Sequence, residues 1–233
     1  MSNHMKRLTM PKTWPIPKKV QLWATKQTAG AHSISESMPA AMILRDMLKV
    51  CDTAKEAKKI VAAHDLVVNG RAVKDAKAPI GLMDVVSLPK SGANYRVQLT
   101  KKGKLTLIPV SEEDAKWILC RIEGKTKVAG GKIQLNLSGG RNVLLDENQY
   151  KPGDSVKLSL ADNKIIGSYP LEQDAVVLII NGRHIGNVET VEKYTVVNRP
   201  TENTVLFKSN NETVKKNIFV IGTGKSEIAE ASE

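Results

Sequence analysis

The chain has 233 residues, of which 41% are hydrophobic and only 4% aromatic, and this composition favours several small aliphatic cores over one large enzyme core. Its 35 lysines and arginines outnumber its 24 aspartates and glutamates, so the net charge of +11 favours polyanions, although an ordinary soluble protein with a basic surface gives the same count. The sequence has no apolar segment of roughly 18 residues, no apolar leader and no cysteine or histidine pairs spaced for zinc. We therefore expect a cytoplasmic protein without a membrane segment, metal, cofactor or small-molecule substrate.

Residues 1–40 form a basic segment without helical or strand periodicity. Six of their side chains are lysine or arginine and one, Glu36, is acidic, while four prolines interrupt helix propagation. This composition predicts a basic extended N-terminal arm with a short strand near residues 19–24, and we expect the arm to order on a partner. Trp14 and Trp23 either pack on RNA or on a neighbouring protein, or cover the arm's own contact with the central domain.

Two helices are predicted after the arm. Within residues 40–51 an apolar face is expected because hydrophobic residues recur at helical spacing, at Ile43, Met47 and Val50. A second helix is predicted to begin at Asp52 or Thr53. Thr53 followed three residues later by Glu56 is the pattern of a capping box, in which each residue satisfies a backbone N–H of the other.

A β-hairpin is predicted directly after the helices. Asn69-Gly70 joins the apolar stretches at residues 66–68 and 71–73, and this dipeptide is preferred in type I′ turns because both central residues have positive φ. Further strands are expected at residues 85–88 and on either side of a turn at residues 101–103.

Residues 106–170 are predicted to be mostly β. Acidic residues at the beginning of 111–120 suit the positive end of a helix dipole, so a short helix is expected there. Strands follow at residues 133–137 and 143–145. A turn at residues 151–154 then leads into an alternating apolar strand.

From residue 171 to 225 short strands recur at the spacing of a small barrel. They are expected at residues 175–180, 188–191, 194–197, 204–207 and 217–221. The acidic segment 226–233 is predicted to be a frayed tail.

Three local patterns suggest catalysis, but each lacks the context that the chemistry needs. The segment 222–226 resembles a phosphate-binding loop, but Phe219 stands where the Walker spacing requires glycine. His184 has no serine, cysteine or carboxylate at a recognisable spacing. The acids at residues 112–114 fit a helix start better than a catalytic pair. We predict that the protein is not an enzyme.

The predicted nucleic-acid contacts are basic side chains in the arm, on the helices and beside two turns. Few acids lie among them, so phosphate contact is the favoured interpretation, and a lysine-rich face that only solvates the helices is the alternative. The predicted RNA-binding residues are Lys6, Arg7, Lys12, Lys18, Lys19, Arg45, Lys49, Lys55, Lys58, Lys59, Arg71, Lys74, Arg183 and His184.

Several separated stretches resemble, in the right order, the e-type family of small-subunit ribosomal protein four from archaea and eukaryotes, in its short archaeal form. These stretches are HMKRLTMPKTWPIPKK, SESMPAAMILRDMLKVC, GLMDVVSLPKSGANYRV, SEEDAKWILCRI and NIFVIGTGK. The resemblance covers nearly the whole chain. It implies a structural, non-catalytic component that binds ribosomal RNA and lies beside other proteins of the small subunit.

The resemblance also implies an α+β fold of three modules behind the arm. These are an αL RNA-binding domain at about residues 41–105, a central mostly-β domain at 106–170 and a KOW-type small β-barrel at 171–225. Arg183 and Gly186 match the KOW pattern, but Glu189 stands where that pattern has glycine, which puts close backbone approach at that turn in doubt.

Two rival functions belong to other classes. An RNA-modifying enzyme of the pseudouridine-synthase type also carries an αL domain, but residues 106–233 offer no candidate catalytic aspartate. A KOW-type transcription or translation factor would bind transiently and would be substoichiometric to ribosomes.

Overall fold

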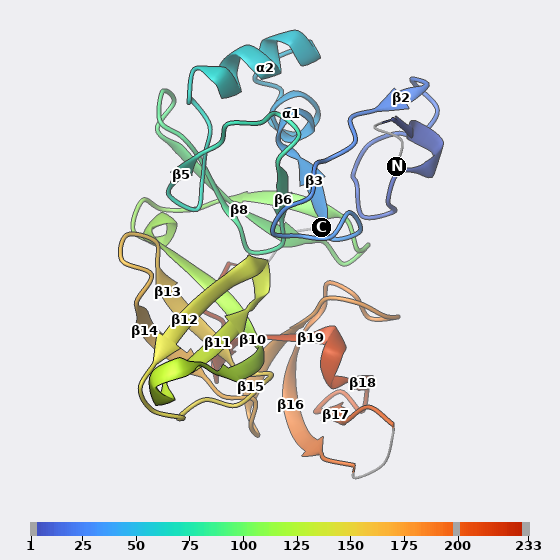
Figure 1. Cartoon of the computed structure of the whole chain (residues 1–233). Coiled ribbons are helices and arrows are strands. Elements are labelled where there is room, and N and C mark those ends of the chain that lie inside the picture. Colours follow the sequence, from blue (N-terminus) through green and yellow to red (C-terminus); the bar gives the residue numbers. More distant parts are fainter. Residues whose placement is uncertain (1–3, 198–200, 230–233) are drawn as a thin grey trace. The chain divides into compact units, whose positions relative to one another are not determined.

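The computed structural model describes residues 4–197 and 201–229 (Figure 1). The chain divides into two compact units. Unit 1 comprises Met1–Gln98 and Lys104–Ile118, and unit 2 comprises Leu99–Gly103 and Leu119–Glu233. Both are mostly β, with few helices. Within the described ranges, no helix has the length and hydropathy needed to cross a membrane.

Unit 1 contains short strands, one regular α-helix and a five-stranded sheet in the order β5-β4-β7-β8-β9. Its elements are β1 (Met5–Lys6), η1 (Arg7–Thr9), β2 (Trp23–Ala24), β3 (Ser37–Pro39), α1 (Ala40–Met42), η2 (Ile43–Met47), α2 (Ala54–Ala62), β4 (Val67–Val68), β5 (Arg71–Ala72), β6 (Pro79–Gly81), β7 (Val85–Leu88), β8 (Ala93–Leu99), β9 (Leu105–Pro109) and η3 (Asp114–Lys116).

The first predicted helix is shorter than residues 40–51 and changes its winding. After α1 the chain continues as the π-helical turn η2, in which the Leu48 N–H donates to the Ile43 carbonyl at 2.9 Å. Residues 40–44 are all buried, so packing rather than a single apolar stripe determines this segment. Val50, expected on the apolar face, lies beyond the helix and is half exposed.

The second predicted helix is confirmed as α2, and its N-terminus has the predicted capping box. The Thr53 hydroxyl accepts from the Glu56 N–H at 3.2 Å, and the Glu56 carboxylate accepts from the Thr53 N–H at 3.3 Å. The bond that the Glu56 carboxylate accepts from the Asp52 N–H, followed by these two bonds with Thr53, holds the pKa of Glu56 below its ordinary value. Ala57 and Val61 form the buried stripe of the helix, so its lysines are left on the solvent side.

The C-terminus of α2 closes on a left-handed residue that is not glycine. His64 has φ 59°, its N–H donates to Val61, and the Asp65 N–H donates to the Ile60 carbonyl at 3.2 Å. This pair of bonds is the Schellman arrangement, which strongly prefers glycine at the left-handed position. The Cβ of His64 therefore adds local steric strain.

The predicted hairpin and the register of its strands are confirmed. Val68 pairs with Arg71 and Val67 with Ala72, and the two turn residues, Asn69 and Gly70, have φ of 50° and 75°. Both angles are positive, as a type I′ turn requires. The turn therefore sets Arg71 at the exposed edge of the sheet.

The expectation of a short helix at residues 111–120 is wrong. Ser111 and Asp114 close a turn, a single 3₁₀ turn follows, and strand β10 (Trp117–Lys127) already begins at Trp117. The four residues Trp117–Cys120 are all buried. A continuous apolar run of this kind is typical of a buried strand, and here it outweighs the acids that favour a helix start.

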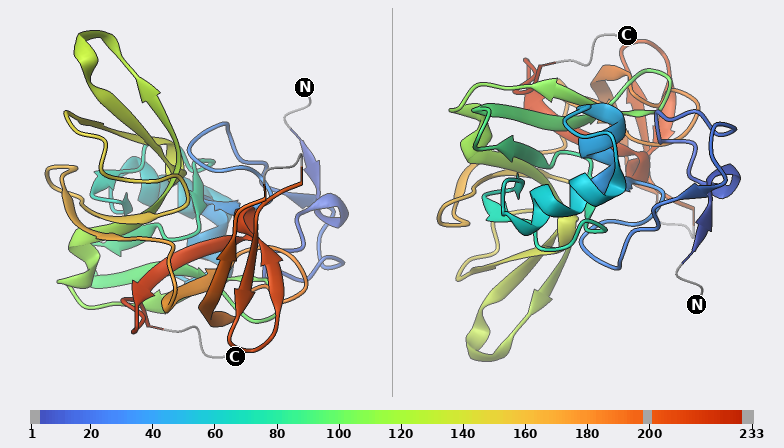
Figure 2. Two further views of the ribbon diagram at one scale, coloured as in Figure 1. Left: turned by 90° about the horizontal axis from the view of Figure 1, so that it is seen from below. Right: turned by 90° about the horizontal axis from the view of Figure 1, so that it is seen from above.

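Unit 2 holds two five-stranded sheets in the orders β12-β11-β10-β13-β14 and β18-β17-β16-β15-β19. Most of its strands are the yellow-green to red arrows in Figure 2. Its further elements are η4 (Ala129–Gly131), β11 (Ile133–Leu137), η5 (Ser138–Gly140), β12 (Arg141–Leu145), β13 (Ser155–Ser159), β14 (Ile165–Tyr169), β15 (Ala175–Ile179), β16 (Val188–Thr195), β17 (Thr204–Phe207), β18 (Glu212–Val214), η6 (Lys215–Asn217) and β19 (Ile218–Thr223).

Near the C-terminus the structure differs from the sequence-based expectations at one strand and at the tail. Residues 188–191 and 194–197 were expected as separate strands, but β16 is one strand that covers the first range and ends at Thr195 within the second, with a register shift between Val191 and Lys193. The segment expected as a frayed tail is packed in its described part, since Ile228 is 7% exposed and the Glu227 N–H donates to Ile221. Residues 230–233 of that tail lie outside the described residues.

Replacing His64 by glycine is expected to raise the free energy of unfolding by up to about 1 kcal/mol, because glycine adopts positive φ without a steric cost from Cβ. Urea unfolding measures this change. His64→Ala is the matched control: it removes the imidazole, keeps Cβ, and should leave the free energy close to that of the wild type. A glycine variant no more stable than the alanine variant would show that this residue carries no strain.

Candidate nucleic-acid interface

The N-terminal arm is part of unit 1 and packs against its strands. Trp14 is 1% exposed, and its indole N–H donates to the Ser37 carbonyl at 2.7 Å. The Leu105 N–H donates to the Thr13 carbonyl at 2.8 Å. Trp14 is therefore buried and bonded within residues 1–40, whereas Trp23 is 52% exposed.

The predicted RNA-binding residues differ in how accessible they are. Arg7 is buried, and its guanidinium donates to the Pro17 carbonyl at 2.7 Å, so it has a structural role in the arm. Lys18, Arg45 and His184 are half-buried. The exposed members of the set are Lys6, Lys12, Lys19, Lys49, Lys55, Lys58, Lys59, Arg71, Lys74 and Arg183.

Helix α2 presents the densest group of exposed predicted contacts, which we term the α2 lysine face: Lys55, Lys58 and Lys59. Lys55 and Lys59 are one turn apart, and neighbouring positions of this kind lie on one side of a helix. The nearby carboxylate of Glu56 is already bonded to the cap of the same helix. The face therefore keeps its positive charge available for an anion.

Arg45 is a weaker candidate than the α2 lysine face. Its guanidinium Nη2 lies 2.8 Å from the Asp46 carboxylate, and both side chains are largely covered. A paired and partly buried guanidinium has less charge to offer a phosphate. Lys49, which follows η2, is exposed but has φ 54°, so its backbone closes the helical segment in the left-handed region.

The hairpin that carries Arg71 is positioned by a buried carboxylate, Asp84. The residue Asp84 is 4% exposed. Its Oδ1 accepts from the Asn69 amide at 2.7 Å, and its Oδ2 accepts from the Gly81 N–H at 2.9 Å. The Asn69 amide oxygen in turn accepts from the Val85 N–H at 2.9 Å. The turn residue Asn69 is thus held by its side chain as well as by its backbone.

The same carboxylate also binds the arm. His32 Nε2 lies 2.9 Å from Asp84 Oδ2. A Cβ at Gly81 would lie 2.4 Å from the His32 ring, so glycine is needed there for the ring to approach. Burial alone lowers the pKa of His32, but the hydrogen bond and the charge of Asp84, with help from Glu36, raise it above the ordinary value.

In unit 2 the loop that carries Arg183 packs against a second basic loop. Gly186 has φ 82°, and a Cβ there would lie 2.1 Å from the Thr100 carbonyl oxygen. This close contact brings the exposed Lys101 and Lys102, on the 99–103 loop, near the 181–186 loop. Sequence reasoning missed both lysines, because only the folded contact between the two loops gives them a place in a basic surface.

Glu189 does not need the conformational freedom of glycine in this fold. It lies inside β16, paired with Val177, and its carboxylate is within 3.5 Å of the Asn211 amide. The close backbone approach in this module is made three residues earlier, at Gly186.

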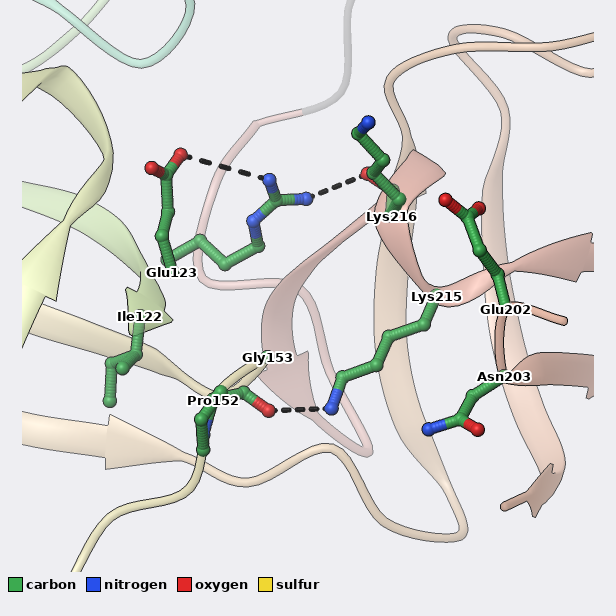
Figure 3. A pocket seen from close by; sticks show the side chains of 9 residues that line it. Ile122, Glu123, Pro152, Gly153, Glu202, Asn203, Lys215 and Lys216 are labelled. Atoms are coloured by element: carbon green, nitrogen blue, oxygen red, sulfur yellow. Dashed lines mark hydrogen bonds and ion pairs between the residues drawn. The ribbon is translucent and has the colours of Figure 1, made fainter. Parts of the chain in front are cut away.

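A cleft of about 520 Å³ in unit 2 has three basic residues in its lining, and the side chains of two of them, Arg121 and Lys215, already have partners (Figure 3). Arg121 Nη1 donates to the carbonyls of Lys216 and Ile218 at 2.8 and 3.1 Å. Lys215 Nζ donates to the Pro152 carbonyl at 2.6 Å. These cations join β10 and the 151–154 turn to the segment before β19, and they serve structure rather than an open anion site. Among the described residues, no group of histidines, cysteines and acids could hold a metal ion.

Comparison with known proteins gives concordant matches over nearly the full length. The model of ribosomal family S4e matches residues 91–165, and that of the RS4NT (NUC023) domain matches residues 1–35. Small ribosomal subunit protein eS4 of Methanothermobacter thermautotrophicus is 40% identical over 230 residues, covering 97% of this chain and 95% of that protein. Its counterpart in Methanocaldococcus jannaschii is 38% identical, covering 94% and 93%.

A solved structure shares the fold. The crystal structure of 30S ribosomal protein S4e from Thermoplasma acidophilum superposes with a TM-score of 0.71 at 30% identity, covering 81% of this chain and 96% of that one.

The wild-type protein should lose stability relative to His32→Gln as pH rises. The His32 pKa is raised in the folded state, so the contribution of its charged form is fully present below the ordinary value of 6.5 and is lost as pH passes the folded pKa. Urea midpoints of both proteins across that range measure the effect. A difference between them that does not change with pH would contradict the charged His32–Asp84 pair.

Gly186→Ala is expected to destabilise unit 2 more than Gly130→Ala. The two glycines have nearly the same φ, 82° and 81°, but a Cβ at Gly130 meets no atom within 4 Å. The extra loss for Gly186→Ala, on the order of 1–3 kcal/mol, isolates the clash with Thr100 from the cost of the dihedral angle. Thermal unfolding gives the comparison, and equal shifts would show that the loops do not depend on this contact.

Proposed function

This chain belongs to ribosomal family S4e, and from that premise we infer that it is a non-enzymatic structural protein of the small ribosomal subunit, acting at the ribosome in the cytoplasm. We propose further that it binds ribosomal RNA through exposed lysines and arginines and lies beside other small-subunit proteins. The observation that supports RNA binding most strongly is the α2 lysine face, where three exposed lysines lie on one helix and the Glu56 carboxylate of that helix is used for capping.

The physical basis of this binding is charge neutralisation. Lysine and arginine that contact phosphates release condensed counterions, so affinity falls as salt rises. Paired A-form RNA hides its base edges in a deep, narrow groove, and recognition of it therefore relies on shape and backbone contacts. A helix face beside a fixed hairpin suits such contacts, because both elements hold their charges on regular backbone.

We propose that the chain forms three modules behind the arm. The two short helical segments and the hairpin at Asn69-Gly70 support an αL RNA-binding domain at about residues 41–105. The second sheet of unit 2 and its 181–186 loop support a KOW-type barrel at 171–225, behind a central β domain at 106–170. The basic arm at 1–40 contributes Lys6, Lys12, Lys18 and Lys19.

Family membership decides against the two rival functions. The relatives that match over nearly their whole length are small-subunit ribosomal proteins, not modifying enzymes or transient factors. The αL and KOW modules are in this interpretation RNA-binding parts of one structural protein.

Replacing Lys55, Lys58 and Lys59 together by alanine should weaken binding to transcribed small-subunit ribosomal RNA. The slope of log affinity against log salt should fall by about 0.7–0.9 for each lysine that contacts a phosphate. Filter binding at several salt concentrations provides the slope.

A matched control removes the same charge from lysines that have carboxylate partners. Lys90, Lys132 and Lys208 pair with Asp65, Asp146 and Asp174 at 2.6, 3.4 and 2.6 Å. Their triple alanine variant should keep a slope close to that of the wild type. Equal losses in the two triple variants would mean that net charge, and not the α2 lysine face, governs binding.

A further inference from the structure

The short antiparallel pair β1–β2 presents a cation and an aromatic ring on one face. Lys6 pairs directly with Trp23, and Met5 pairs with Ala24. Directly paired residues project to the same side of a sheet, and successive residues alternate between sides. Lys6 and Trp23 therefore share one face, and both are exposed, whereas the residues of the other face are half-buried.

Trp23 is far more exposed to solvent than the other two tryptophans. It is 52% exposed, while Trp14 and Trp117 are 1% and 7% exposed. The His4 ring lies 5.7 Å from the Trp23 ring, with 54° between their planes. This tilted contact is not a parallel stack, so the exposed indole surface can still take one.

The charge around this face selects the kind of partner. From His4 to Lys26 the sequence contains no acidic residue, and the segment that joins β1 to β2 carries two further exposed lysines, Lys12 and Lys19. An apolar protein surface would satisfy the indole but leave these ammonium groups without counter-charges. A nucleotide satisfies both, because its base has an aromatic face and its phosphate is an anion.

We propose that β1–β2 is a stacking platform for an unpaired nucleobase of RNA, with Trp23 against the base and Lys6 at the adjoining phosphate. This inference rests on the proposed function and adds the ligand class for the arm. Bases inside an A-form helix are stacked on each other and cannot reach the indole, so the ligand is a single-stranded loop, bulge or end. The α2 lysine face, by contrast, needs no unpaired base.

Titration of the full-length protein with a single-stranded oligoadenylate tests the platform, with a duplex of equal length in parallel. Single-strand binding should quench tryptophan fluorescence, and Trp23→Phe should remove most of that quenching while keeping most of the affinity. Trp23→Ala should weaken single-strand binding by about five- to a hundredfold and leave the salt slope unchanged. Lys6→Ala should lower the slope by about 0.7.

Leu22→Ala is the matched control, because Leu22 is the adjacent residue, is 64% exposed and is also apolar. Its single-strand affinity should equal that of the wild type, and an equal loss would assign the effect to general apolar contact and overturn base stacking. Both half-exposed sites should tolerate alanine, which an unchanged urea midpoint verifies.

The failure of this inference can be distinguished from the failure of the proposed function. If Trp23→Ala leaves single-strand affinity unchanged while the α2 triple variant still loses RNA affinity, the platform is wrong and the proposed function stands. If Trp23→Ala is instead lost from small subunits at unchanged RNA affinity, the face binds a neighbouring protein and the stacking proposal is overturned.

Discussion

The buried carboxylate of Asp84 is the constraint on which unit 1 depends. A buried charge is costly unless it is paired and hydrogen-bonded, and Asp84 meets this condition with the Asn69 amide, the Gly81 N–H and the His32 ring. Its three partners belong to the hairpin turn, the end of β6 and the N-terminal arm. One side chain therefore sets the hairpin, and with it Arg71, relative to the arm.

Charged residues in this protein divide into those that build the fold and those that remain for a ligand. Arg96 is buried, donates to the Asp114 and Trp117 carbonyls at 2.7 and 3.1 Å, and lies 4.0 Å from the Trp117 ring centroid. Burial lowers the pKa of Arg96 to about 10. Arg7, Arg121 and Lys215 likewise donate to backbone carbonyls. A basic composition alone therefore overstates the proposed RNA-binding surface. The exposed members of the predicted set, in the arm, after η2, on α2, beside the hairpin turn and in the 181–186 loop, are the part that remains.

Local sequence patterns correctly predicted those elements whose interacting residues lie within a few positions of each other. The capping box at Thr53 and the turn at Asn69-Gly70 are confirmed because both ends of each interaction are close in sequence. Residues 111–120 were wrongly predicted as a helix because acidic residues at a turn resemble the start of a helix. The apolar residues Trp117–Cys120 that follow are the start of a buried strand. The candidate site was predictable from the sequence only as a list of cations. Its arrangement was not, because His32 meets Asp84, and Lys101 approaches the loop that carries Arg183, only after the chain has folded.

The most direct test is a density map of the native small subunit that contains this protein. We expect Lys55, Lys58 and Lys59 to lie within contact distance of ribosomal RNA phosphates, with the hairpin of Arg71 on the same RNA surface. A map in which the α2 lysine face points to solvent or packs on another protein would contradict it.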